Sequence, residues 1–235
     1  MRLVTLAAAV LLTESVATPQ HGYVSIRAPA VAISVTGGAA EVSATLYDAN
    51  GIKGDGLVVE REASRTRIVL VAPVKRGARL EAHVRTDTDL RIEGSNGGPV
   101  IVHRVNGQLE IVNSNAGIVL DRVGGTVLAS TSNGAIEATL HSVNPTLPMS
   151  FLTSNGRIDL TFPANMKANF RIESDAGPIT TDFQLARIPG EPLERKVMRG
   201  GRLRTIIRGA VNGGGPDISV RTENAPIVIR RQKAG

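Results

Sequence analysis

The sequence predicts an all-β fold, namely a β-solenoid (parallel β-helix-like) with coils of about 20 residues and a less regular β cap at its N-terminal end. Three observations predict it. The chain has 25 Gly, 4 Phe, 2 Tyr and no Trp, so tight turns are frequent and large side chains are rare. Short strands of alternating polarity recur at short intervals, and every second turn carries the same polar pair. Helical periodicity is not sustained in the mature chain.

Residues 1–17 have the pattern of a secretory signal peptide. Arg2 gives the positive start, residues 3–12 are apolar, and Ser15-Val16-Ala17 forms a small-residue cleavage site. The apolar stretch is shorter than the roughly 18 residues that a membrane span needs, although an uncleaved anchor is the alternative. The chain contains no Cys, hence no disulfide and no lipidated cysteine. We therefore expect an exported, non-lipidated protein of the periplasm or cell surface.

Residues 18–84 are expected to form the N-terminal β cap. They contain alternating apolar segments but lack the regular glycine phrase that follows. An end that covers unpaired strand edges is required in a stack of coils. The expected strands are 31–35, 42–46, 68–71 and 80–84.

Residues 85–235 are expected to form the repeat domain. A turn followed by an alternating strand returns as Asn106-Gly107, Asn133-Gly134 and Asn155-Gly156, among weaker copies. In the clearest strand, Ile158, Leu160 and Phe162 alternate with Asp159 and Thr161, which predicts one buried and one wet face. A last coil is expected near the C-terminus, at residues 218–229.

Every second turn carries a Ser-Asn or Ser-Asp pair, with spacings of 19, 18, 22 and 20 residues. In a solenoid these corners lie above one another, so their side chains can form a hydrogen-bonded ladder. An antiparallel meander or sandwich, the alternative fold, gives no reason for this double period. The ladder residues are Ser95, Asn96, Ser114, Asn115, Ser132, Asn133, Ser154, Asn155, Ser174 and Asp175.

Three segments carry a resemblance to a known family: Ser132-Asn133-Gly134-Ala135-Ile136, residues 154–163 and Gly177-Pro178-Ile179. Together with the surrounding strands of residues 84–230, they resemble an adhesin-like bacterial family of β-strand-repeat domains of unknown function. That family is similar to the head domains of autotransporter adhesins. The resemblance implies a right-handed β-solenoid-like fold, export to the cell envelope and no established enzyme activity.

The sequence offers no recognisable catalytic or metal site. The four His residues have neither metal-ligand spacing nor a nucleophile elbow beside them. The acidic residues fall at different positions of the repeat, whereas a glycosidase needs two carboxylates at a defined separation. We therefore expect no enzyme activity, no metal and no cofactor.

The segment 187–208 holds the strongest local charge of the chain, an excess of positive over negative residues. It predicts either a solvated excursion between coils or a surface that binds an anionic envelope component, such as acidic glycan or lipid headgroups. Nucleic acid is not expected because aromatic residues are not interleaved with the cations. The candidate binding residues are Arg195, Lys196, Arg199, Arg202, Arg204 and Arg208.

Taken together, these features predict an exported, non-enzymatic β-repeat protein that acts as an adhesin-like or structural interaction module of the cell envelope. The partner can be an envelope protein, a glycan or an anionic lipid surface, and the sequence sets no oligomeric state. The alternative is an envelope glycan-binding protein or a carbohydrate-active enzyme on a β-solenoid.

Overall fold

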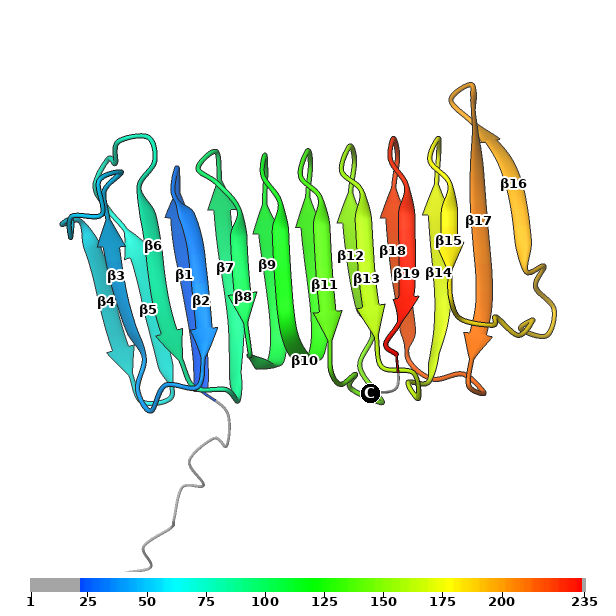
Figure 1. Cartoon of the computed structure of the whole chain (residues 1–235), viewed down its shortest axis with the longest axis horizontal. Helices are drawn as coiled ribbons and strands as arrows, with labels where there is room; N and C mark the ends of the chain where they lie inside the picture. Colours follow the sequence, from blue (N-terminus) through cyan, green and yellow to red (C-terminus); the bar gives the residue numbers. More distant parts are fainter. Residues whose placement is uncertain (1–21, 234–235) are drawn as a thin grey trace, which may run out of the picture.

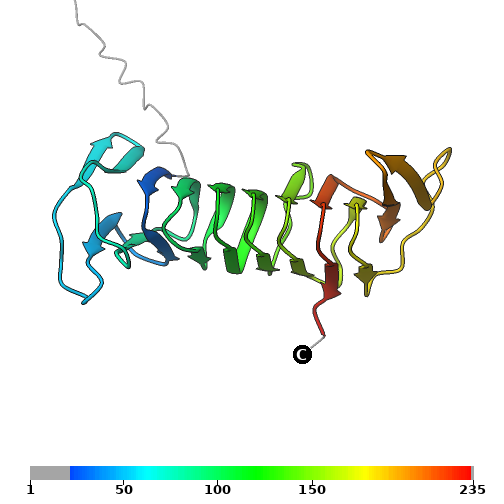
Figure 2. The same cartoon turned by 90° about the horizontal axis from the view of Figure 1, so that it is seen from above.

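The computed structural model of the chain describes residues 22–233, which form nineteen β-strands and no helix (Figure 1). The expected signal peptide, residues 1–17, lies outside the described residues. The strands lie in two facing layers, here called sheet A and sheet B (Figure 2). Strand β10 runs through both, so all nineteen strands are linked by hydrogen bonds. The all-β class predicted from the sequence is confirmed.

Sheet A begins at the N-terminal end of the molecule and follows an order that differs from the chain order. In space it consists of β4 (Leu57–Glu62), β5 (Arg65–Leu70), β1 (Gly22–Pro29), β7 (Thr88–Ser95), β9 (Asn106–Asn113), β10 (Ile118–Thr131), β12 (Met149–Thr153), β18 (Asp217–Thr222), β14 (Ala168–Ser174), β17 (Arg202–Val211) and β16 (Glu194–Arg199).

Sheet B faces sheet A and follows the same spatial course. It consists of β3 (Ser43–Tyr47), β6 (Arg79–Val84), β2 (Ala32–Gly37), β8 (Val100–His103), the first part of β10, β11 (Ile136–Leu140), β13 (Ile158–Phe162), β19 (Ile227–Arg231) and β15 (Ile179–Thr181).

The central strands pair in parallel and place like residues above one another. Leu109 lies between Leu90 and Val127 in sheet A, and Ile136 lies between Ile118 and Ile158 in sheet B. Parallel neighbours need a connection that returns to the same end of the sheet, and here the strand in the opposite sheet provides it. The antiparallel meander considered from the sequence is therefore wrong for the central strands.

The core lies between the two sheets and is built from the inward residue of each alternating pair. Ile158, Leu160 and Phe162 are fully buried, while Asp159 and Thr161 point outward. Most of the core is Val, Ile and Leu, whose branched side chains suit a pleated surface. In the C-terminal half, four rings pack in series, two pairs edge to face and the third tilted, with centroid separations of 6.3, 5.8 and 6.4 Å. They belong to Phe151, Phe162, Phe170 and Phe183.

A coil here means a strand of sheet A together with the sheet B strand that follows it, and the coils pack side by side as a stack. Near each end of the chain, one coil lies in the interior of this stack. Strands β1 and β2 lie between the β5–β6 and β7–β8 coils. Strands β18 and β19 lie between the β12–β13 and β14–β15 coils, as their red colour shows in Figure 1. Residues 218–229 do form the last coil along the chain, but that coil lies inside the stack and not at its end. Chain order does not fix the neighbours, because a strand pairs wherever its inward and outward residues match.

Antiparallel strands close both ends of the stack. At the N-terminal end β3 pairs with β6 and β4 pairs with β5. At the C-terminal end β17 pairs antiparallel with both β14 and β16. Residues 22–84 share both sheets with the repeat that follows, through the β1–β7 and β2–β8 pairings. Within residues 22–233, no helix long and apolar enough to cross a membrane occurs.

Deleting residues 216–235 removes β18 and β19 and leaves edges open inside the stack, on β12, β13, β14 and β15. We expect this shortened chain to lose cooperative thermal unfolding and to aggregate, because open edges pair with other chains. Circular dichroism melting and size-exclusion chromatography measure both effects. A control that lacks only residues 233–235 should melt like the intact chain. If the two truncations behave alike, the inserted position of the last coil is refuted.

Candidate functional site

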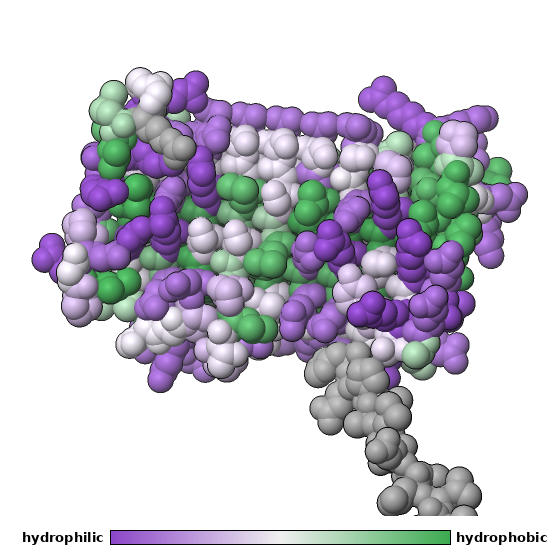
Figure 3. All heavy atoms as spheres, turned by 180° about the vertical axis from the view of Figure 1, so that it is seen from behind, coloured by the Kyte–Doolittle hydropathy of each residue, from purple (hydrophilic) through white to green (hydrophobic). Residues whose placement is uncertain are grey.

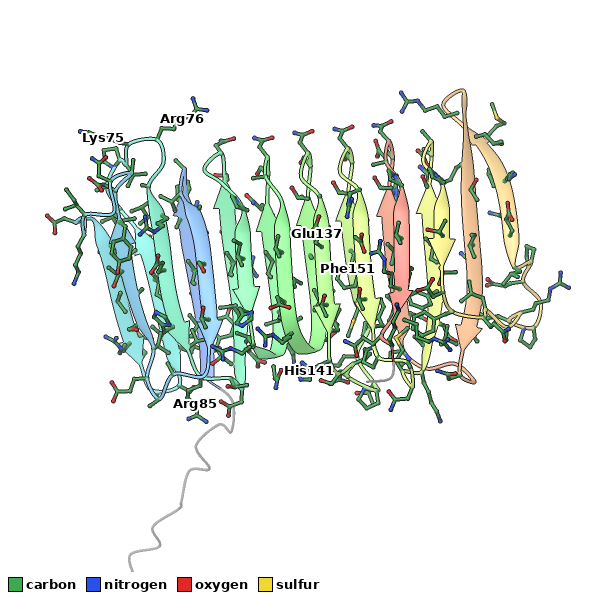
Figure 4. All side chains as sticks on the ribbon, viewed as in Figure 1. Lys75, Arg76, Arg85, Glu137, His141 and Phe151 are labelled. Atoms are coloured by element: carbon green, nitrogen blue, oxygen red, sulfur yellow. The ribbon has the colours of Figure 1, made fainter. Side chains whose placement is uncertain are left out.

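The corner that leads from sheet A to sheet B carries an unbroken row of asparagine side chains. Each amide donates through Nδ2 to Oδ1 of its neighbour: Asn115 to Asn96 at 2.5 Å, Asn133 to Asn115 at 2.8 Å, and Asn155 to Asn133 at 2.7 Å. An amide suits this row because it is donor and acceptor at once. Figure 4 shows side chains at regular intervals along this edge, and Figure 3 shows a continuous hydrophilic line there.

The row continues onto Asn224, which the sequence analysis missed. Asn224 Nδ2 donates to Asn155 Oδ1 at 2.6 Å, and Arg202 Nη1 donates to Asn224 Oδ1 at 2.6 Å. The guanidinium of Arg202 therefore lies at the end where the aligned amide dipoles present oxygen. A sequence signal did exist, since Asn224-Ala225-Pro226-Ile227 matches Ala176-Gly177-Pro178-Ile179.

A second row of polar side chains lies buried at the same corners, at the last residue of successive sheet A strands. The Thr153 hydroxyl donates to the Gly134 carbonyl at 3.0 Å and accepts from the Gly156 N–H at 3.1 Å. The Thr222 hydroxyl donates to the Gly156 carbonyl at 3.0 Å in the next coil. These bonds link each corner to its neighbour and satisfy backbone groups that would otherwise be buried without partners. The row consists of Asn113, Thr131, Thr153, Thr222 and Ser174.

Glycine follows Asn133 and Asn155 because neighbouring coils approach each other closely at these positions. A Cβ at Gly134 would lie 2.1 Å from the Ala116 carbonyl oxygen, and one at Gly156 would lie 1.7 Å from the Gly134 carbonyl oxygen. Any side chain there would push the coils apart. At these two positions the Asn-Gly phrase marks a stacked corner, whereas in a hairpin it marks a tight turn.

Ser174 and Asp175 do not continue the Ser-Asn register, so their assignment to the ladder is wrong by one position. Ser174 pairs with Thr222, and its hydroxyl accepts from the Gly177 N–H at 2.9 Å, as the buried threonines do in their corners. Asp175 consequently corresponds to Glu223, one residue before the position that asparagine occupies in the other corners. A serine hydroxyl can replace a threonine hydroxyl in this bond, and for that reason the dipeptide alone does not set the register.

The remaining ladder serines hold the corner through their backbone. Ser132 N–H donates to the Ser114 carbonyl at 3.1 Å, and Ser154 N–H donates to the Ser132 carbonyl at 3.2 Å. The Ser95 carbonyl accepts from the N–H of Ala30, in the inserted N-terminal coil, at 2.6 Å. The ladder of side chains is thus made by the asparagines, and the serines link neighbouring corners through their backbone hydrogen bonds.

The basic segment predicted as an anionic-surface site is largely engaged in internal contacts. Arg204 Nη2 lies 2.8 Å from Asp175 Oδ2, and Arg204 Nη1 lies 3.5 Å from Glu173 Oε2. The side chains of this trio are only 8%, 13% and 7% exposed. The hydrogen bond that Arg204 donates to Asp175 raises the pKa of Arg204 above its ordinary value, and burial opposes that rise. Arg204 is therefore a structural cation.

Other cations of the segment also have partners. Arg208 Nη1 lies 2.7 Å from Glu191 Oε2, and Lys196 Nζ lies 3.6 Å from Glu194 Oε1. Arg195 is exposed on β16, while the side chain of Arg199 lies outside the described part of the chain. Among the described side chains, Arg195 and Arg208 border a small hollow with Glu191. Arg202 and Arg204 are instead held by Asn224 and Asp175, so the predicted cations are divided between two places.

A hollow of about 520 Å³ opens instead on the outer face of sheet A, where β14, β17 and β18 lie side by side. Arg171, Arg208 and Arg221 line it, together with residues 188 and 191 of the excursion between β15 and β16. Of the predicted cations, only Arg208 takes part. Arg171 and Arg221 escaped the sequence analysis because the inserted coil brings β18 beside β14.

Several outward carboxylates elsewhere are paired with basic side chains on the same strand or the next. Arg91 Nη1 lies 3.1 Å from Glu110 Oε2, and Arg157 Nη2 lies 2.8 Å from Asp159 Oδ2. On sheet B, Asp121 Oδ2 lies 2.7 Å from His103 Nδ1. Among the described residues, no group of three or more His, Cys, Asp or Glu side chains is arranged to hold a metal ion.

Comparison with protein-family models and with curated proteins gives no match. Among solved structures, a "putative cell adhesion protein" from Clostridium sporogenes is similar to this chain at 11% sequence identity and a TM-score of 0.38. The similarity covers 92% of this chain and 94% of that chain. A likeness at this TM-score carries no argument about fold or function.

Replacing Asn133 by Ala removes one bond to each neighbouring coil. We expect the free energy of unfolding to fall by about 1–2 kcal/mol, since each net hydrogen bond contributes about 1 kcal/mol. Urea unfolding of a chain that begins at residue 18 measures the change. The control is Ser132→Ala, since the Ser132 hydroxyl takes part in no hydrogen bond among the described residues. Equal midpoints for the two variants would show that the amide row adds nothing to stability.

Replacing Arg204 by Met leaves Glu173 and Asp175 poorly hydrated without their shared cation. We expect a loss of about 2 kcal/mol in the free energy of unfolding, between the values for exposed and for buried ion pairs. The matched control is Arg91→Met, which removes the exposed pairs with Glu93 and Glu110 and should change stability little. A similar loss in both variants would argue against a structural role specific to Arg204.

Proposed function

We propose that the chain is an exported, non-enzymatic β-solenoid that serves as an adhesin-like or structural interaction module of the cell envelope. One observation carries the proposal: carboxylates on the outer faces of the central strands are held in ion pairs, and two of the three carboxylates that line the hollow over β14 and β18, Glu173 and Glu191, are each bound to an arginine. Arg91 with Glu110 and Arg157 with Asp159 represent this arrangement on the two sheets. A hydrolase that uses two carboxylates needs them free to exchange protons on either side of a bond.

The long face of sheet A supports a role in binding. Three aliphatic side chains at its centre are exposed to 43%, 46% and 41%, and they come from neighbouring strands β9, β10 and β12: Val112, Leu128 and Leu152. Figure 3 shows this apolar centre between charged regions. A rigid face with an apolar centre and a charged surround is typical of a partner-binding surface.

The alternative function, an envelope glycan-binding protein, is favoured by the hollow over β14, β17 and β18. It is concave and lined by Ser219, Asn169 and Asp217 as well as arginines, so it offers donors and acceptors to a hydroxyl-rich ligand. A carbohydrate-active enzyme is less well supported. Glu173 and Glu191, which line the hollow, are each bound to an arginine.

Export and binding can be tested together in a bacterial host. We expect the full chain to reach the periplasmic or surface fraction and a chain lacking residues 2–17 to stay in the cytoplasm, because residues 1–17 have the signal-peptide pattern. The purified mature chain should then bind isolated envelope material saturably without releasing soluble sugar or peptide. Retention of the full chain in the cytoplasm would contradict the envelope role, and release of products would contradict the non-enzymatic one.

A further inference from the structure

The hollow on sheet A places three guanidinium groups on adjacent strands. Ser219 of β18, Arg171 of β14 and Arg208 of β17 share one row across the sheet, and Arg221 lies two residues further along β18. The excursion between β15 and β16 borders the hollow through Ile188 and Glu191. Arg221 belongs to the inserted coil, whereas Arg171 and Arg208 belong to strands beside it. The site therefore exists only when the inserted coil is in place.

Two of these arginines lie directly opposite each other in an antiparallel pair. Arg171 of β14 is the register partner of Arg208 of β17. Like charges in this position destabilise a sheet unless anions lie near them. Glu173 engages Arg171 at 2.6 Å and Glu191 engages Arg208 at 2.7 Å, which offsets part of the repulsion. The remaining repulsion between the two arginines lowers the stability of the sheet unless an anionic ligand binds here.

Hydrogen-bond donors of the hollow are incompletely used. The Nε groups of Arg208 and Arg221 are buried without an acceptor among the described residues. Among the described residues, Arg221 forms an ion pair only with Glu223, at 3.5 Å. A guanidinium has five N–H donors, so most of those of Arg221 are left for another acceptor. The two side chains remain 32% and 33% exposed where they border the hollow. Both can therefore donate to an added oxyanion after a small side-chain adjustment.

The charge balance of the hollow selects the kind of anion. Its three arginines are matched by three carboxylates, those of Glu173, Glu191 and Asp217. Such a site tolerates a single negative charge better than the two charges of a phosphate monoester. Asp217, Ser219 and Asn169 add acceptors and donors suited to hydroxyl groups.

We propose that this hollow binds a uronic acid unit of an acidic envelope glycan. The ligand carboxylate accepts hydrogen bonds from Arg208 and Arg221, and the sugar hydroxyls bond to Asp217 and Ser219. This inference rests on the proposed function as an envelope binding module and names the ligand class for one site on it. No bond is made or broken in the ligand.

Isothermal titration of the mature chain with a galacturonic acid trisaccharide tests the site. We expect saturable binding, at least about tenfold tighter than that of the uncharged galactose trisaccharide, because charge-assisted hydrogen bonds are lost with the carboxylate. Arg221→Gln and Arg208→Gln should each weaken binding about tenfold while leaving the circular dichroism spectrum unchanged. Arg91→Gln, on the same sheet face but outside the hollow, should bind like the unaltered chain.

Three results would overturn the inference. The first is equal binding of the charged and uncharged trisaccharides, and the second is equal binding by the Arg91, Arg208 and Arg221 variants. The third is a preference for inorganic phosphate over the galacturonic acid trisaccharide, which would identify a phosphate-bearing ligand instead. Any of these, with envelope binding by the mature chain retained, would reject the uronate site and leave the proposed function standing.

Discussion

The in-register stacking of the corners between sheets A and B is the constraint on which the rest of the structure depends. In the corners that follow β10, β12 and β18, a buried threonine hydroxyl donates to a carbonyl of the neighbouring coil, as Thr153 does to Gly134. An exposed asparagine amide in each of these corners donates to the amide of its neighbour. Glycine at positions 134 and 156 lets the coils approach closely enough for both bonds. The spacing of the strands, and hence the alignment of the core and of the outer rows, follows from this contact.

The sequence was sufficient to predict the all-β class and the positions that form most of the asparagine row, because residues such as Asn115 and Asn133 recur at the coil period. It was insufficient for the order of the coils. The pattern of Ile218-Ser219-Val220 matches Met149-Ser150-Phe151 and Phe170-Arg171-Ile172 equally well, and it pairs with both. The predicted position of Ser174 in the ladder was wrong for a similar reason, since a serine hydroxyl can replace a threonine hydroxyl in the buried row.

The insertion of the last coil also determines the surface chemistry. Placing β18 beside β14 brings Arg221 next to Glu173 and assembles the hollow with Arg171 and Arg208. The basic segment of residues 195–208 instead serves mainly as part of the C-terminal closure, where Arg204 is held by Glu173 and Asp175. Local charge along the sequence was therefore a poor guide to the site, because its cations come from strands that are distant in the chain.

The chain contains no cysteine, so an engineered disulfide can test the order of the coils directly. Adjacent parallel strands lie about 4.8 Å apart, within the range that a disulfide spans. With the last coil inserted, the double variant Asn155→Cys and Asn224→Cys should oxidise to an intramolecular disulfide, seen as a mobility shift that reductant reverses. The pair Asn155→Cys and Ala176→Cys should stay reduced, because β18 and β19 separate those coils. Cross-linking of the second pair and not the first would contradict the stacking order.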